Sequence, residues 1–126
     1  MIHYTKTWHK SCKYILFFCC FLSVAQTNSL DPKIIEKITN SIFIIEGRTN
    51  TKYLYGIKSV KYKNNKEARE ICVRTVRNNY VRWVKSGQTN KYFEFLGNRF
   101  CPVPGDKTGL NKNWVNNLRK VSGLDL

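Results

Sequence analysis

Histidine, acidic residues and proline are scarce in this 126-residue chain. Both histidines lie near its start, and only 8 Asp and Glu residues stand against 22 Lys and Arg. The three prolines and seven glycines exclude collagen-like and low-complexity proteins. No run of 18 apolar residues occurs, which argues against a full transmembrane helix. The length then favours one basic globular domain.

Several catalytic signatures are missing as well. The chain has no nucleophile elbow and no phosphate-binding loop, and no histidine follows His9. Two well-separated cysteines without a histidine cannot supply the four ligands of a zinc site, so we expect no metal and no cofactor. If this protein is an enzyme, its acid or base must therefore be a carboxylate.

The first 25 residues have the three-part pattern of a secretory signal peptide. Lys6, Lys10 and Lys13 precede an apolar run over 14–22, which ends in the small residues 23–25. The alternative is an uncleaved anchor, but about 12 apolar residues in a helix span only ~18 Å of a ~30 Å hydrocarbon core. We therefore expect an exported protein, periplasmic or extracellular, whose contact with the membrane is transient and made through this segment.

Cleavage after Ala25 would leave one domain over 26–126. The removed segment holds three of the five cysteines and three of the 22 basic residues, so the mature chain keeps 19 basic and 8 acidic residues, a net charge of +11. It also keeps Cys72 and Cys101, and an even number of cysteines in an exported domain indicates a disulfide. Closing this loop would stabilise the fold by roughly 3 kcal/mol. The alternative is a pair of buried thiols.

The mature chain is expected to be mainly α-helical. Asp31 and Pro32 are typical of a helix start, and isoleucines at helical spacing continue to Gly47, which favours a stop. Further helices are expected over 68–85, 90–100 and from 111 or 113 to 122, with Tyr92, Phe93, Phe95, Leu96, Trp114, Val115, Leu118 and Val121 facing inward. Between the first two helices, 52–63 shows an alternation that suits a short strand or an extended loop.

Glu46 is the strongest candidate for chemistry. Stepping back by four residues gives Ile42 and Ile38, so Glu46 continues an apolar stripe at the last turn of the first helix. Partial desolvation and the negative end of the helix dipole both disfavour the charged form of a carboxyl there, whereas Arg48 favours it. A carboxyl that stays protonated can act as a general acid. The alternative is a solvated ion pair with Arg48.

Two short strings then match a known pattern. Ile44-Ile45-Glu46-Gly47, followed by Tyr55-Gly56-Ile57-Lys58-Ser59-Val60, resembles the Glu-Ser…Tyr-Gly-Leu-Met-Gln-Ile pattern of the lysozyme-like superfamily, specifically the small lytic transglycosylases and lysozyme-like proteins of bacteria and phages. The stretches Tyr92–Pro102 and Asn111–Trp114 also resemble the C-terminal part of compact members. Two departures occur, because Gly47 replaces the usual Ser and Ser59 stands where Gln is usual.

The resemblance implies a compact lysozyme-like helical domain with a small extended or β element. Its substrate would be peptidoglycan, cleaved at the β-1,4 bond between N-acetylmuramic acid and N-acetylglucosamine. Glu46 would be the catalytic residue, and Gly56 would let the backbone approach the sugar. Tyr55, Ser59 and Tyr80 are the further candidates for substrate contact, and we expect a monomer.

Hydrolysis and anhydro-sugar formation differ in their need for a second carboxylate. Among the other acidic residues only Glu94 and Asp106 are credible partners for Glu46, and Asp106 lies in a Pro- and Gly-containing loop. A mechanism with one carboxylate is therefore favoured. In the lytic transglycosylases that this chain resembles, the single Glu acts first as acid and then as base, and the product is a 1,6-anhydro sugar.

The basic surface leaves other functions open. A secreted basic protein without catalysis could bind cell wall or nucleic acid, and the segment 80–85 interleaves aromatic and basic residues as a strand-stacking surface would. Core packing explains Tyr80 and Trp83 more simply, because both lie on the apolar column of a helix. The export signal and the absence of a reader motif argue against nucleic acid as a partner. A membrane-active role for the same helix is weakened by Thr75 and Asn79 on that face.

Overall fold

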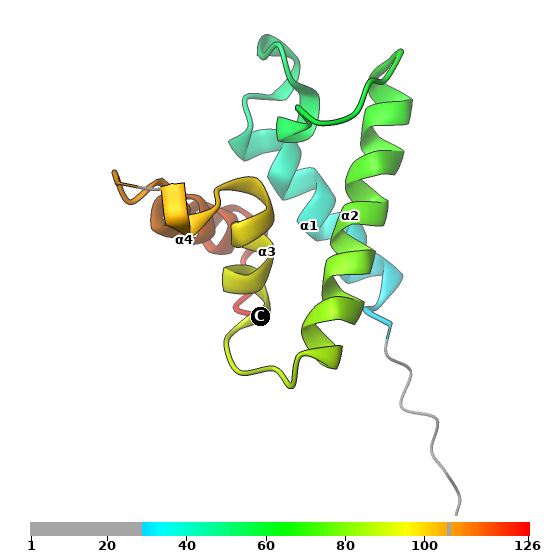
Figure 1. Cartoon of the computed structure of the whole chain (residues 1–126). Coiled ribbons are helices and arrows are strands. Elements are labelled where there is room, and N and C mark those ends of the chain that lie inside the picture. Colours follow the sequence, from blue (N-terminus) through cyan, green and yellow to red (C-terminus); the bar gives the residue numbers. More distant parts are fainter. Residues whose placement is uncertain (1–28, 106) are drawn as a thin grey trace, which may run out of the picture.

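A computed structural model describes residues 29–105 and 107–126 (Figure 1). In this part of the chain, four α-helices are joined by loops and short 3-10 turns, so the predicted mainly α class is confirmed. Helix α1 packs against α2 and α4, and α3 lies between α2 and α4. No helix in the described residues is long and apolar enough to cross a bilayer. The expected signal peptide over 1–25 falls outside the described residues.

Helix α1 (Pro32–Ile45) begins and ends where its sequence signals predict. The Asp31 side chain accepts a hydrogen bond of 2.7 Å from the backbone N–H of Lys33, which satisfies one of the unpaired donors of the first turn. Ile35, Ile38 and Ile42 are buried along one face. The chain then leaves the helix through Gly47, whose φ of 96° is a left-handed conformation.

Helix α2 (Asn65–Lys85) starts slightly earlier than predicted. The Asn64 side chain caps it by accepting from the backbone N–H of Glu67 at 2.9 Å. Its core face carries Ala68, Cys72 and Val76. The upper part of this helix, as drawn in Figure 1, stands beside the loop that leads away from α1.

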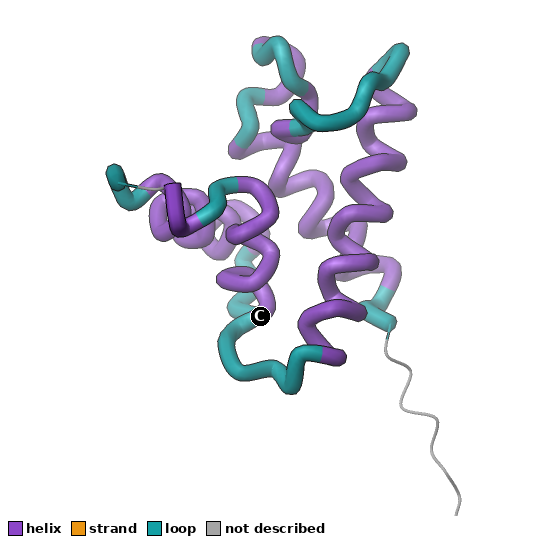
Figure 2. The backbone as a smooth tube through the Cα atoms, viewed as in Figure 1, coloured by secondary structure: helices purple, strands orange, loops and turns teal. Residues whose placement is uncertain are grey.

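The segment between α1 and α2 contains no strand, so the strand interpretation of residues 52–63 is wrong (Figure 2). Two 3-10 turns, η1 (Arg48–Asn50) and η2 (Leu54–Gly56), occupy it instead. Tyr55 and Gly56 both have positive φ, 55° and 68°, which reverses the chain and prevents a continuous extended run. A hydrogen bond of 2.8 Å from the Leu54 N–H to the Tyr62 hydroxyl oxygen holds the loop closed.

Helices α3 (Tyr92–Phe100) and α4 (Leu110–Ser122) pack on each other, and a third 3-10 turn, η3 (Val103–Gly105), lies between them. Most of the residues expected to face inward are buried: Tyr92, Phe93, Leu96, Trp114, Val115 and Leu118. Phe95 is only half-buried. The prediction that Val121 belongs to the core is wrong, since Val121 is 40% exposed while Ser122 is buried. The cause is helical spacing, because Ser122 continues the i+4 column of Trp114 and Leu118.

The expected disulfide is absent from the structure, in which Cys72 and Cys101 are both thiols. Cys72 is 1% exposed on the core face of α2, whereas Cys101 is half-buried at the end of α3. The helical core therefore closes by apolar packing without this covalent link. The alternative of two thiols is the one that the structure contains.

Candidate functional site

Glu46 lies at the C-terminal end of α1, where its backbone N–H donates to the Ile42 carbonyl at 3.0 Å. Its side chain is half-buried. The indole Nε1–H of Trp114, on α4, donates a hydrogen bond of 2.8 Å to Glu46 Oε1. This bond joins two helices across 68 positions of sequence and fixes the orientation of the carboxyl group.

Gly56 lies directly against this carboxyl group. A Cβ atom at position 56 would stand 2.7 Å from Glu46 Cδ and 2.8 Å from Oε2, closer than real Cβ contacts. The φ of +68° at this position disfavours other residues as well. Gly56 was expected to let the backbone approach a sugar, but in the structure its close approach is to Glu46.

Trp114 also connects the carboxyl group to a neighbouring pocket. Its ring stacks on that of Phe100, with centroids 4.7 Å apart and planes inclined by 15°. Gly56, which lies against the Glu46 carboxyl group, and Phe100, which stacks on Trp114, both line the pocket. Glu46 itself does not line this pocket, and lies behind Gly56.

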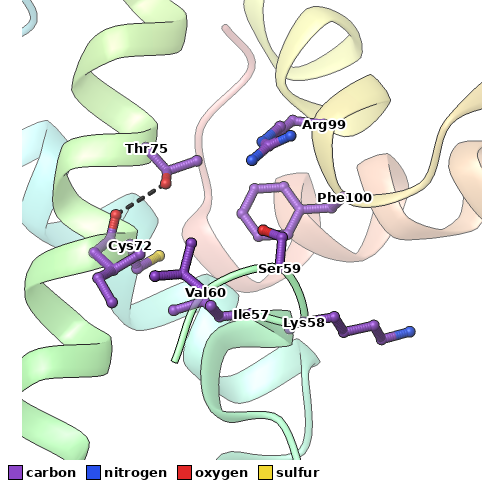
Figure 3. Close-up of a pocket in the computed structure, with 10 residues that line it drawn as sticks. Ile57, Lys58, Ser59, Val60, Cys72, Thr75, Arg99 and Phe100 are labelled. Atoms are coloured by element: carbon purple, nitrogen blue, oxygen red, sulfur yellow. Dashed lines mark hydrogen bonds between the residues drawn. The ribbon is translucent and has the colours of Figure 1, made fainter. Parts of the chain in front are cut away.

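The pocket lies between α2, the end of α3 and the loop after η2 (Figure 3). Its volume is about 230 Å³. Apolar side chains supply much of the wall, and hydroxyl and cationic groups supply the remainder. The lining residues are Gly56, Ile57, Lys58, Ser59, Val60, Ile71, Cys72, Thr75, Arg99 and Phe100.

The charge of the pocket is positive. No acidic residue lines it among the described part of the chain. The Arg99 guanidinium points across the pocket toward Thr75 on α2 (Figure 3). Lys58 points away from α2, and its ammonium lies 5.9 Å from the centre of the Tyr53 ring. Arg99 is therefore the cation that the pocket itself presents.

The predicted substrate residues are placed very differently from one another. Ser59 and Gly56 line the pocket. Tyr55 is only 3% exposed, and its ring packs on Phe43 with centroids 4.9 Å apart. Burial raises the pKa of the Tyr55 hydroxyl. Tyr55 thus supports the floor of the loop and offers little surface to a ligand.

Tyr80 is not brought to this pocket. Its ring lies edge-on to Tyr92 at 5.3 Å and beside Trp83 at 5.5 Å. The Tyr92 hydroxyl donates to the Val76 carbonyl at 2.7 Å, which fixes this aromatic cluster to α2. The core-packing interpretation of Tyr80 matches these contacts.

Two important residues were not singled out from the sequence as site residues. Trp114 was assigned to the core from its helical spacing, and Arg99 was only one of many scattered cations. Both lie in stretches that the sequence analysis singled out, Tyr92–Pro102 and Asn111–Trp114, and this was the available signal. Spacing alone could not reveal that Trp114 turns its N–H toward Glu46.

Cys72 is a poor candidate for a nucleophile despite lining the pocket. Burial raises the pKa of its thiol to about 12, and the positive charge of Arg69 only partly opposes this shift. Because the thiolate is the reactive form, the thiol is inert near neutral pH. The described residues also contain no cluster of three or more His, Cys, Asp or Glu side chains that could hold a metal ion.

Comparisons of the chain with protein-family models, with curated proteins and with solved structures gave no match. The candidate site is therefore defined by its own geometry: a carboxyl group held by an indole N–H and a glycine, behind the wall of a cationic pocket.

Proposed function

We propose that this protein is an exported, peptidoglycan-cleaving glycosidase of the lysozyme-like kind, which acts as a lytic transglycosylase on the β-1,4 bond after N-acetylmuramic acid. The observation that carries the proposal is the Glu46 carboxyl group, which accepts the indole N–H of Trp114 and lies against Gly56, a residue that lines the pocket. A positioned carboxyl group is what the protonation of a glycosidic oxygen requires. The proposal has a second support in the order of Glu46, Gly56 and Ser59 along the chain, which resembles the lysozyme-like pattern.

Among the described residues, the arrangement favours one carboxylate over two; Asp106, the other acid that the sequence offered, lies outside the described residues. Glu94, which the sequence offered as a second acid, pairs with Arg119 at 3.3 Å on an exposed face. Glu67 accepts from the Lys63 N–H at the start of α2, and Glu36 pairs with Arg69. Most retaining and inverting glycosidases need a second carboxylate close to the first. A glycosidase with Glu46 alone would instead use the sugar's own hydroxyl as nucleophile.

In the proposed reaction, the substrate extends from the pocket past Gly56 to Glu46. Oε1 accepts the Trp114 N–H, so the acidic proton is carried by Oε2, the oxygen that lies nearer to where a Cβ at Gly56 would stand. Oε2 gives this proton to the glycosidic oxygen as the C1–O bond breaks. The carboxylate then removes the proton of the C6 hydroxyl, O6 bonds to C1, and a 1,6-anhydro sugar forms without consuming water.

The test is a zymogram on purified cell wall, with the chain from Gln26 onward, followed by mass analysis of the soluble products. We expect lysis and products that lack the water added by hydrolysis. Glu46→Gln keeps the shape and removes the acid, so activity should fall by about 10²–10⁴-fold. Glu94→Gln is the matched control, because it makes the same substitution in a surface ion pair. Lysis that survives Glu46→Gln would refute the assignment, and binding without lysis in the unaltered chain would favour a non-catalytic wall-binding protein.

A further inference from the structure

The pocket beside Glu46 combines one cation with apolar walls. Arg99 lines it from the end of α3 and is exposed, so its guanidinium is accessible to a ligand. Ile57, Val60 and Phe100 supply the apolar surface around it. A ligand that matches these features carries a negative charge on a small aliphatic group.

Arg99 is one of several arginines whose charge is not neutralised by a described acidic residue, and it is the one that lines this pocket. Arg119 binds Asp125 at 3.0 Å and Glu94 at 3.3 Å, and Arg69 pairs with Glu36. No ion pair joins Arg99 to any residue of 29–105 or 107–126. Because a guanidinium presents a planar fork of N–H donors, it binds carboxylates in a bidentate geometry.

The pocket also contains two hydroxyl groups, those of Thr75 and Ser59, which can make different hydrogen bonds to a ligand. Thr75 Oγ1 donates to the Ile71 carbonyl at 2.9 Å, so the oxygen remains an acceptor toward the pocket (Figure 3). Ser59 lines the pocket from the loop after η2, and its hydroxyl can donate to a carboxylate that Arg99 holds. The pocket can therefore bind a carboxylate. It can also accept a hydrogen bond from a neighbouring amide N–H or hydroxyl O–H of the same ligand.

From this geometry we infer that Arg99 is a specificity residue, which binds a carboxylate on the aliphatic substituent of the sugar next to the bond that Glu46 cleaves. This inference rests on the proposed function and names its substrate class: glycan strands that bear acidic substituents, in preference to neutral glycans. The carboxylate has two sources, the lactyl group of a bare N-acetylmuramic acid and the acid terminus of an attached peptide.

The experiment measures binding separately from cleavage. Calorimetry with the Glu46→Gln chain uses three probes that are not consumed: N-acetylmuramic acid, an N-acetylmuramoyl peptide with an acid terminus, and the same peptide with amidated carboxyl groups. We expect an acidic probe to bind at least about tenfold more tightly than the amide, the size of effect expected for a hydrogen bond to a charged group. Whichever acid binds more tightly identifies the source of the carboxylate.

Arg99→Gln should abolish this preference, and Arg99→Lys should restore part of it, because lysine keeps the charge and loses the fork. Arg77→Gln is the matched control, since Arg77 is an exposed arginine of α2 that does not line the pocket. Cleavage is then compared on acidic wall glycan and on a neutral N-acetylglucosamine oligomer. Arg99→Gln should lower kcat/KM about tenfold on the first and leave the second unchanged.

Failure of the inference and failure of the proposed function are distinguishable. If the unaltered chain cleaves wall but Arg99→Gln keeps the same preference, the inference is overturned while the function stands. If no glycan is cleaved but the acidic probes bind in an Arg99-dependent way, the function is overturned and the carboxylate site is supported. Equal binding of all three probes would also overturn the inference.

Discussion

The two ends of α2 are built in different ways. In its N-terminal half, Ile71, Cys72 and Thr75 face a pocket that a loop and the end of α3 complete. Near its end, Tyr80 and Trp83 pack on Tyr92 with ring centroids 5.3 and 5.6 Å apart. We call these the site end and the aromatic end of α2.

The difference shows that the candidate site and a cluster that stabilises the fold occupy different parts of the same helix. At the aromatic end, the rings pack on one another, and the Trp83 Nε1–H donates to the Asn90 backbone carbonyl at 2.7 Å. Near the site end, the indole N–H of Trp114 on α4 donates to the Glu46 carboxyl group, and Arg99 on α3 has no ion pair with a described residue. The site end therefore borders a pocket with a cation available to a ligand, whereas the aromatic end is packed against other rings.

Among the variants that keep Glu46, the largest effect on activity is expected from Gly56→Ala. The added Cβ would collide with the Glu46 carboxyl group, and a displacement of about 1 Å is enough to reduce catalysis by about 10²-fold. Gly123→Ala is the matched control, because its φ of +64° imposes a similar backbone cost of about 1–2 kcal/mol with no atom within 4 Å. Wall-lysis rates and urea unfolding measure the two effects. Equal loss of activity in both variants would mean that backbone strain, and not the Glu46 contact, is responsible.

Trp114→Phe should have a smaller effect, of about tenfold on kcat. Phenylalanine keeps the ring that stacks on Phe100 but loses the N–H that binds Glu46 Oε1. KM should change little, since Trp114 is not a lining residue of the pocket. Trp83→Phe removes the corresponding indole bond at the aromatic end and should lower stability by about 1 kcal/mol without changing kcat. A kcat that falls equally in both variants would contradict the positioning role of Trp114.

Cys72 gives a pH-dependent prediction for the site end. Its folded-state pKa of about 12 lies above the ordinary value of 9.0, so above about pH 9 the unfolded chain releases a proton that the folded chain retains. Stability should then fall with rising pH between about 9 and 12, by up to about 1.4 kcal/mol per pH unit. Urea unfolding at pH 8, 9 and 10 measures this slope, which Cys72→Ala should reduce. Equal slopes, or a two-dalton mass increase on reduction, would contradict the buried thiol.

The smallest effect is expected at the aromatic end. Tyr80→Leu removes the ring contacts with Trp83 and Tyr92 and should cost about 0.5–1.5 kcal/mol of stability, with KM for wall glycan unchanged. A raised KM without loss of stability would restore Tyr80 as the substrate residue that the sequence suggested. Thermal unfolding together with lysis kinetics separates the two outcomes.

Local signals in the sequence predicted the helices well. The caps at Asp31 and Asn64 depend on hydrogen bonds that span two and three residues, and such patterns can be read directly from the chain. The apolar column of α1 likewise placed Glu46 at a helix end. Of the two interpretations of 52–63, the strand is wrong because an alternating pattern does not show that Tyr55 has a positive φ. The disulfide is wrong because the number of cysteines does not show where the thiols lie in the fold.

The sequence by itself determined the helices, the basic charge and the position of Glu46 at the end of α1, because these depend on composition and on neighbours within a few residues. Only the tertiary structure decided that Trp114 holds Glu46 across 68 positions, that Gly56 lies against the same carboxyl group, and that Arg99 faces the pocket. Those contacts depend on how α4 and α3 pack against the rest of the fold and on a loop that reverses through left-handed residues. No short-range periodicity carries that information.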